Sequence, residues 1–190
     1  ALPISVQDGY NLYQQYFIVS DEGEWTSITQ GMNKNNRRAR RYHWHSPTVR
    51  SFVDAPHTGI VGEKGAPVLN LTDKKADMLR TNIVGLTKEK PTEVLDTYRG
   101  IVMPNRHDVR EEDVNMTRLG SVLNMAYNRD IDNFEDLVMM KGVGPKTLKS
   151  LAMVSEVVHG DASRFEDPAR FSFAIGDRKS TRLNSSHSEI

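Results

Sequence analysis

A nine-residue segment rich in lysine and glycine carries the clearest chemistry in this chain. It reads Lys-Gly-Val-Gly-Pro-Lys-Thr-Leu-Lys from Lys141 to Lys149 and contains no acidic residue. Glycines on both sides of a valine favour a tight turn, and a proline suits the first turn of a helix, whose N–H groups bind anions. We therefore predict a turn that binds phosphate through Lys141, Lys146 and Lys149 and through the segment's Gly142, Val143, Gly144 and Thr147.

Apolar residues at helical spacing lie on both sides of this turn, among them Leu137, Met140, Leu148 and Leu151. The pattern resembles the helix-hairpin-helix motif, which holds a DNA backbone without reading its sequence. The resemblance implies DNA as the partner, bound through its phosphates. The alternative is an ordinary helical hairpin with a glycine turn.

Two polar residues near predicted strand ends are candidates for metal-dependent nuclease chemistry. Such enzymes need carboxylate or amide oxygens that converge on a hard cation such as Mg²⁺ or Mn²⁺. Asp8 precedes the first predicted strand and is the candidate metal ligand, and Gln30 ends the second strand. The second strand lacks the Asp/Glu-x-Lys pattern that follows the catalytic Asp in restriction-endonuclease-like sheets. The alternative for Asp8 is a turn residue beside Gly9.

Three histidines, His43, His57 and His107, could assist such a reaction as acids, bases or phosphate contacts if the fold brings them together. His45 would share one side of an extended segment with His43, a spacing that could bind a transition metal. The alternative for each is a surface or structural histidine.

The stretch from Lys34 to Arg41 contains five basic residues. It could line a phosphate-binding face, with Tyr42 and Trp44 available to stack on bases. The alternative is a solvated charged face. We predict that Arg40 and Arg41 contact DNA.

Composition limits the wider possibilities. The 25 basic and 25 acidic residues cancel, so nucleic acid must be bound by local clusters. The absence of cysteine excludes disulfides, thiolate zinc sites and cysteine nucleophiles, and fits a cytoplasmic location. No apolar run approaches the ~20 residues that cross a bilayer. The oligomeric state is not predictable from this sequence.

Hydrophobic patterns predict an α+β fold, in which a small mixed or antiparallel sheet with helices precedes an all-helical module. The predicted hairpins are Tyr13–Ser20 with Trp25–Gln30, and Thr58–Gly62 with Val68–Leu71. Predicted helices run from Thr72 or Asp73 to Val84 and from Pro91 to Tyr98, and the chain is helical after Glu111. The predicted divisions are residues 1–110, the helix-hairpin-helix module 111–160, an extension 161–176 and a tail 177–190.

Short motifs spread along the chain also resemble those of the family catalogued as domain of unknown function number 763. They include Gln7-Asp8-Gly9-Tyr10, Gln30-Gly31-Met32-Asn33, Ala39-Arg40-Arg41-Tyr42-His43-Trp44, Pro56-His57-Thr58, His107-Asp108-Val109 and Asp167-Pro168-Ala169-Arg170. The resemblance spans about Ala1 to Gly176 and implies that the chain is the C-terminal half of a DNA nuclease. His45 is not part of the motif that contains His43.

The last residues have a different character. From Asp177 they read Asp-Arg-Lys-Ser-Thr-Arg-Leu-Asn-Ser-Ser-His, which resembles the translation of a sequencing-library adapter. The alternative is a basic tail that helps to bind nucleic acid. We treat them as an artefact and expect a fragment of a longer protein, since the chain also begins with Ala1.

The leading prediction is a fragment of a metal-dependent DNA nuclease, in which Asp8 and Gln30 position the metal and the lysine-glycine turn holds the backbone. A non-catalytic DNA-binding or DNA-repair scaffold is the main alternative. An RNA-processing factor stays open, because a phosphate contact alone does not distinguish the two sugars.

Overall fold

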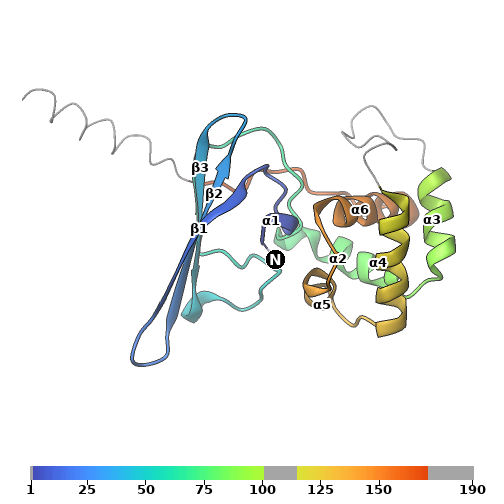
Figure 1. Ribbon diagram of the computed structural model, residues 1–190, viewed down its shortest axis with the longest axis horizontal. Coiled ribbons are helices and arrows are strands. Elements are labelled where there is room, and N and C mark those ends of the chain that lie inside the picture. The colour runs from blue at the N-terminus through green and yellow to red at the C-terminus, as the bar shows by residue number, and fades with distance from the viewer. Residues whose placement is uncertain (1, 101–114, 171–190) are drawn as a thin grey trace, which may run out of the picture. The chain divides into compact units, whose positions relative to one another are not determined.

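Two units alternate along the chain in the computed structural model, which describes residues 2–100 and 115–170. The helical unit contains residues 2–8, Ser51–Ala55 and the described part of Val68–Glu166. The sheet unit contains Gly9–Arg50, Pro56–Pro67 and residues 167–170. A four-stranded antiparallel sheet and several helices confirm the predicted α+β class (Figure 1). No helix within the described residues is long and apolar enough to cross a membrane.

The sheet has the strand order β1-β2-β3-β4, and each neighbouring pair is antiparallel. The strands are β1 (Asn11–Val19), β2 (Trp25–Asn33), β3 (Arg38–His45) and β4 (Gly59–Val61). Strands β1 and β2 confirm the first predicted hairpin. A 3₁₀ turn, η1 (Ser46–Thr48), follows β3.

The second predicted hairpin was wrong, because β4 pairs with β3 rather than with residues 68–71. Leu69 and Asn70 instead form isolated bridges to Phe165 and Val6 within the helical unit. Leu69 and Leu71 belong to the core of that unit. Their β-favouring side chains therefore mark a buried extended segment and not a sheet strand.

One face of the sheet is held by a buried ion pair between Arg40 and Asp167. The Nη2 atom of Arg40 lies 2.8 Å from Oδ2 of Asp167, and the two side chains are 1% and 2% exposed. Arg40 also donates to the Glu63 carbonyl, at 2.8 Å, and its guanidinium lies 4.6 Å from the Tyr10 ring centroid. This arginine therefore fixes which face of β3 is covered.

Asp167 completes this arrangement through the backbone of two further segments. Its carboxylate accepts hydrogen bonds from the N–H groups of Gly65, at 2.6 Å, and Ala169, at 3.0 Å. Burial by itself raises the pKa of Asp167, but the hydrogen bond from Arg40, those from Ala169 and Gly65, and the Arg40 charge together lower it. The carboxylate is thus ionised in the folded protein and joins three segments of the sheet unit.

The helical unit contains six α-helices among the described residues and one 3₁₀ turn, η2 (Lys74–Ala76). The helices are α1 (Leu2–Ser5), α2 (Asp77–Thr87), α3 (Pro91–Gly100), α4 (Met116–Arg129), α5 (Phe134–Met139) and α6 (Pro145–His159). Asp73 caps η2 by accepting from the Lys75 N–H, whereas α2 begins only at Asp77 and has no side-chain cap. Asn133 caps α5 by accepting from the Asp136 N–H.

The core of this unit forms around α2, which contacts α4, α5 and α6. Leu79 and Ile83 of α2 are fully buried with Leu123, Leu137 and Leu151 of the later helices. Helix α2 therefore belongs with the C-terminal helices, and the division predicted at residue 110 stays a prediction. That position itself lies outside the described residues.

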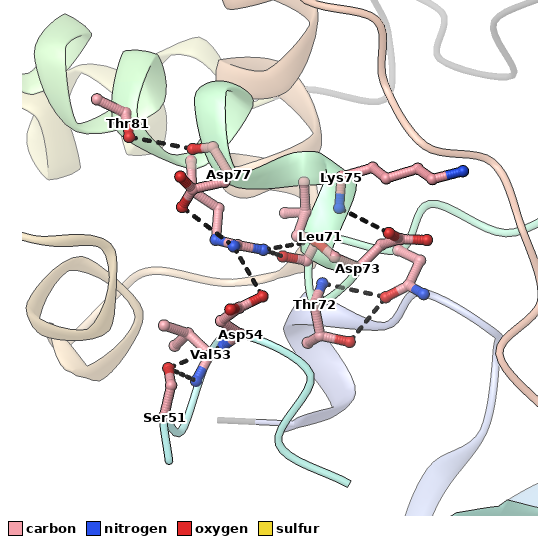
Figure 2. Close-up of polar contacts among 11 residues, drawn as sticks. Ser51, Val53, Asp54, Leu71, Thr72, Asp73, Lys75, Asp77 and Thr81 are labelled. Carbon is pink, nitrogen blue, oxygen red and sulfur yellow. Dashed lines mark hydrogen bonds and ion pairs between the residues drawn. The ribbon is translucent and has the colours of Figure 1, made fainter.

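A buried arginine at the start of α2 organises the polar side of this core. Arg80 is 4% exposed and donates to the carbonyls of Leu71, at 2.9 Å, and Asp73, at 2.8 Å. It also donates to the carboxylates of Asp54, at 3.0 Å, and Asp77, at 3.3 Å. Figure 2 shows the labelled partners around this group. The guanidinium thus ties two extended segments to α2.

We expect Arg80→Ala to lower the free energy of unfolding by roughly 3 kcal/mol, because it leaves buried carbonyls and Asp54 without their donor. Urea unfolding followed by circular dichroism measures this change. Arg99→Ala is the matched control, since Arg99 forms an exposed pair with Asp96 and should cost less than about 1 kcal/mol. Equal small losses in both variants would contradict this role of Arg80.

Candidate nucleic-acid interface

The predicted lysine-glycine turn joins α5 to α6, as the sequence indicated. Helix α5 ends with Met140 as its C-cap, and the N–H of Val143 donates to the Met140 carbonyl at 3.2 Å. Gly142 adopts φ +95°, a left-handed conformation that favours glycine. Gly144 is the extended N-cap of α6, and Pro145 follows at the first helical position.

Apolar contacts anchor this turn to the core of the helical unit. Val143, between the two glycines, packs against the core cluster, and Leu148 in the first turns of α6 is fully buried. The Leu148 N–H donates to the Gly144 carbonyl at 3.0 Å and begins the helix. The side chain of Gln7 also donates to the Pro145 carbonyl, at 2.8 Å. The start of α6 is therefore held in place from both sides.

The surface of the turn is basic. Lys141 and Lys146 are exposed, and Lys149 is half-buried. No side chain caps the N-terminus of α6, so the positive end of the helix dipole faces outward beside these cations. This arrangement favours an anion at the start of the helix.

A pocket of about 380 Å³ lies at this helix start. Gly144, Pro145, Lys146 and Thr147 line one side of it, and Asn115 and Arg118 at the beginning of α4 line another. Arg118 donates to the carbonyl of Gly142 at 3.4 Å. The pocket thus combines the N-terminal end of α6 with two cationic side chains, Lys146 of α6 and Arg118 of α4.

The two candidate metal residues, Asp8 and Gln30, belong to different units of the chain. Asp8 belongs to the helical unit and Gln30 to the sheet unit, and Oε1 of Gln30 accepts a hydrogen bond from Nε of Arg41 at 3.2 Å. Among the described residues, no group of three or more His, Cys, Asp or Glu side chains could hold a metal ion.

His43 and His57 do not lie together. His43 alternates along β3 with Tyr42 and Trp44, whereas the His57 ring lies 5.8 Å from the Tyr42 ring and 5.0 Å from the Trp44 ring. The side chains of His43 and His57 therefore lie on opposite faces of the sheet. Burial, and then the charge of Arg41, lower the pKa of His43. His107 lies outside the described residues.

His43 and His45 do share a face of β3, as their spacing predicted. Nδ1 of His45 lies 3.0 Å from the hydroxyl oxygen of Thr26. Nε2 of His43 is buried and has no hydrogen-bond partner in the described part of the chain. The two imidazoles thus lie on the face opposite to His57.

The residues predicted to bind nucleic acid in the basic stretch also lie on opposite faces of β3. Arg40 is buried in its pair with Asp167, so the prediction that it contacts DNA does not fit this structure. Tyr42 and Trp44 are 6% and 7% exposed and cannot stack on bases. Arg41 is exposed on the other face. Successive residues of β3 point to opposite faces of the sheet, and the sequence alone did not show which face is covered. The structure places Arg40 on the covered face and Arg41 on the other.

Sequence reasoning missed Arg118 and the role of Asp167. Arg118 lies in the first turn of α4, and no local pattern links it to a turn 24 residues later. Asp167 lies 127 residues from Arg40, its partner. A buried motif arginine needs an acidic partner, which could have directed attention to the Asp-Pro-Ala-Arg motif.

The fold and this site define an α+β protein with a basic two-helix turn. Residues 4–182 match the family described as Protein of unknown function (DUF763), and the chain belongs to that family. A search of curated proteins and a search of solved structures found no match. The family match includes residues 177–182, in the predicted adapter segment; that segment lies outside the described residues, and its origin stays a prediction.

His57 generates a pH prediction. Burial lowers its pKa from 6.5 to about 4, so the unfolded chain binds this proton at a higher pH than the folded chain. Stability should therefore fall as the pH decreases from 6.5 towards 4. His57→Phe keeps a ring beside Trp44 but cannot titrate, and it should show a shallower fall in melting temperature. An unchanged slope in this variant would exclude His57 as the cause.

Proposed function

We propose that this chain binds DNA through its phosphate backbone, without sequence preference, and that the turn between α5 and α6 is a helix-hairpin-helix motif. The observation that carries the proposal is the start of α6, where an uncapped helix end meets Lys141 and Lys146 in a segment without acids. A phosphate oxygen there would accept hydrogen bonds from backbone N–H groups and face the lysine charges.

The shape of the turn supports a backbone contact rather than base reading. Gly142 and Gly144 have no side chains that could reach a base, and they allow a phosphate to approach the main chain closely. Contacts to phosphates position a protein on DNA but carry no sequence information directly. Neutral overall composition leaves binding to this local cluster, so affinity should depend strongly on salt.

Lys146→Glu combined with Lys149→Glu should weaken binding to duplexes of different sequence by similar factors. The slope of log affinity against log salt should fall by roughly two, about one for each lysine. Fluorescence anisotropy with labelled duplexes at several salt concentrations measures both quantities.

The matched control is Lys74→Glu with Lys75→Glu, which makes the same charge change at exposed lysines of η2 in the same unit. The control should retain nearly wild-type affinity. If both double variants bind as well as the wild type, the turn is only structural; if both lose the same affinity, net charge and not the turn controls binding.

Cleavage of DNA with Mg²⁺ or Mn²⁺, assisted by Asp8, stays a prediction from the sequence. If the chain cuts DNA, Asp8→Ala should abolish cutting and leave affinity unchanged, because the turn and not Asp8 holds the backbone. Gel assays with each metal and with a chelator measure cutting. Equal binding with metal or chelator and cutting with neither would favour the non-catalytic scaffold. Retained cutting in Asp8→Ala would remove Asp8 from the site.

A further inference from the structure

The face of the sheet opposite Arg40 carries exposed side chains on β1 and at Arg41, and half-buried side chains at Ile28, Gln30 and His43. In the paired register, Tyr16 lies opposite Ile28, and Ile28 lies opposite His43. One step along the strands, Gln30 lies opposite Arg41. Directly opposed residues of a sheet share a face, so these side chains form two adjacent rows. We call this surface the open face.

The rows continue across β1. Gln14 lies opposite Gln30, and Ile18 lies opposite Thr26, which is paired with His45. Tyr16 is 51% exposed, and its hydroxyl accepts a hydrogen bond from the side-chain amide of Gln14 at 2.5 Å. The phenol ring is thus oriented by its neighbour while it stays accessible. An exposed planar ring beside an amide group is suited to a flat, polar ligand.

Charge is distributed unevenly along this surface: the rows themselves contain Arg41, and the acids Asp21, Glu22 and Glu24 lie in the turn between β1 and β2, at the opposite end of the sheet. The rows contain no carboxylate, and the segment from Asn33 to His45 contains no acidic residue. Arg41 is exposed and accompanied by the exposed Lys34 and Arg37 in the turn between β2 and β3, at the end of the sheet nearest to the Arg41 row. Cations therefore lie at one end of the open face, and the Tyr16 ring lies on its edge strand, in the row next to that of Arg41.

We propose that the open face binds single-stranded nucleic acid. A base stacks on the Tyr16 ring, the amides of Gln14 and Gln30 offer hydrogen bonds to base edges, and Arg41 faces the phosphates. Stacking on an exposed aromatic ring beside cations is how proteins hold single strands without strong sequence preference. The bases of a duplex are already stacked on one another and do not offer their faces to a protein ring.

The charge favours nucleic acid over a protein partner. The exposed apolar residues of β1 would also suit another protein chain, but that would not account for rows that contain Arg41 and no carboxylate. The inference extends the proposed function, and it rests on that function only for the expectation that the ligand is nucleic acid. The turn of the helical unit and the open face are tested with different ligands and different variants.

The experiment measures binding of the full chain to labelled oligothymidylate and oligouridylate by fluorescence anisotropy. Tyr16→Ala should weaken single-strand binding roughly five- to a hundred-fold, the range measured for loss of one stacked base. Tyr16→Phe should retain most of the affinity, because it keeps the ring and loses only the hydroxyl. Arg41→Gln should weaken binding and reduce its salt dependence. The two oligonucleotides show whether DNA or RNA is preferred.

Tyr127→Ala is the matched control, because Tyr127 on α4 is 45% exposed and belongs to the helical unit. The inference is overturned if Tyr16→Ala binds as tightly as the wild type, if it is no weaker than Tyr127→Ala, or if Tyr16→Phe loses as much as Tyr16→Ala. It is also overturned if the wild type binds neither oligonucleotide, or if Tyr16→Ala only dissociates a dimer in sedimentation. Failure of the lysine variants to change duplex binding would instead reject the proposed function and leave this result intact.

Discussion

The buried contact between Arg40 and Asp167 is the constraint on which the sheet unit depends. A guanidinium without exposed surface needs a carboxylate, a carbonyl and a ring around it, and Asp167, Glu63 and Tyr10 supply them. Because Arg40 points to the covered face and side chains alternate along a strand, Arg41 and His43 point to the other face. One ion pair therefore decides which members of a basic stretch can meet a ligand.

The helical unit uses a comparable arrangement for a different purpose. Arg80 satisfies carbonyls of an extended segment that passes through an apolar core, where unpaired carbonyls would be costly. This stabilises the packing of α2 against α6, the helix whose first turn forms the basic site. The exposed end of α6 can thus remain uncapped because the rest of the helix is fixed by burial.

The two surfaces differ in the chemistry that they offer. The turn after α5 presents backbone N–H groups and lysines, which suit the phosphates of any nucleic acid. The open face adds a phenol ring and amides, which suit bases that are not paired. A protein with both kinds of surface would bind structures that contain duplex and single-stranded parts, and each surface would contribute independently to affinity.

Local sequence determined the elements whose signals are short in range: the β1–β2 hairpin, and the turn at Gly142 with Pro145 after it. These follow from backbone conformations and hydrogen bonds within a few residues. The sequence also predicted two imidazoles on one side of β3. Only the tertiary structure decided that Arg40 is buried, that His57 and His43 lie on opposite faces, and that residues 68–71 leave the sheet. Each of these depends on a partner far along the chain, such as Asp167 or Phe165, and periodicity within one segment carries no information about such partners.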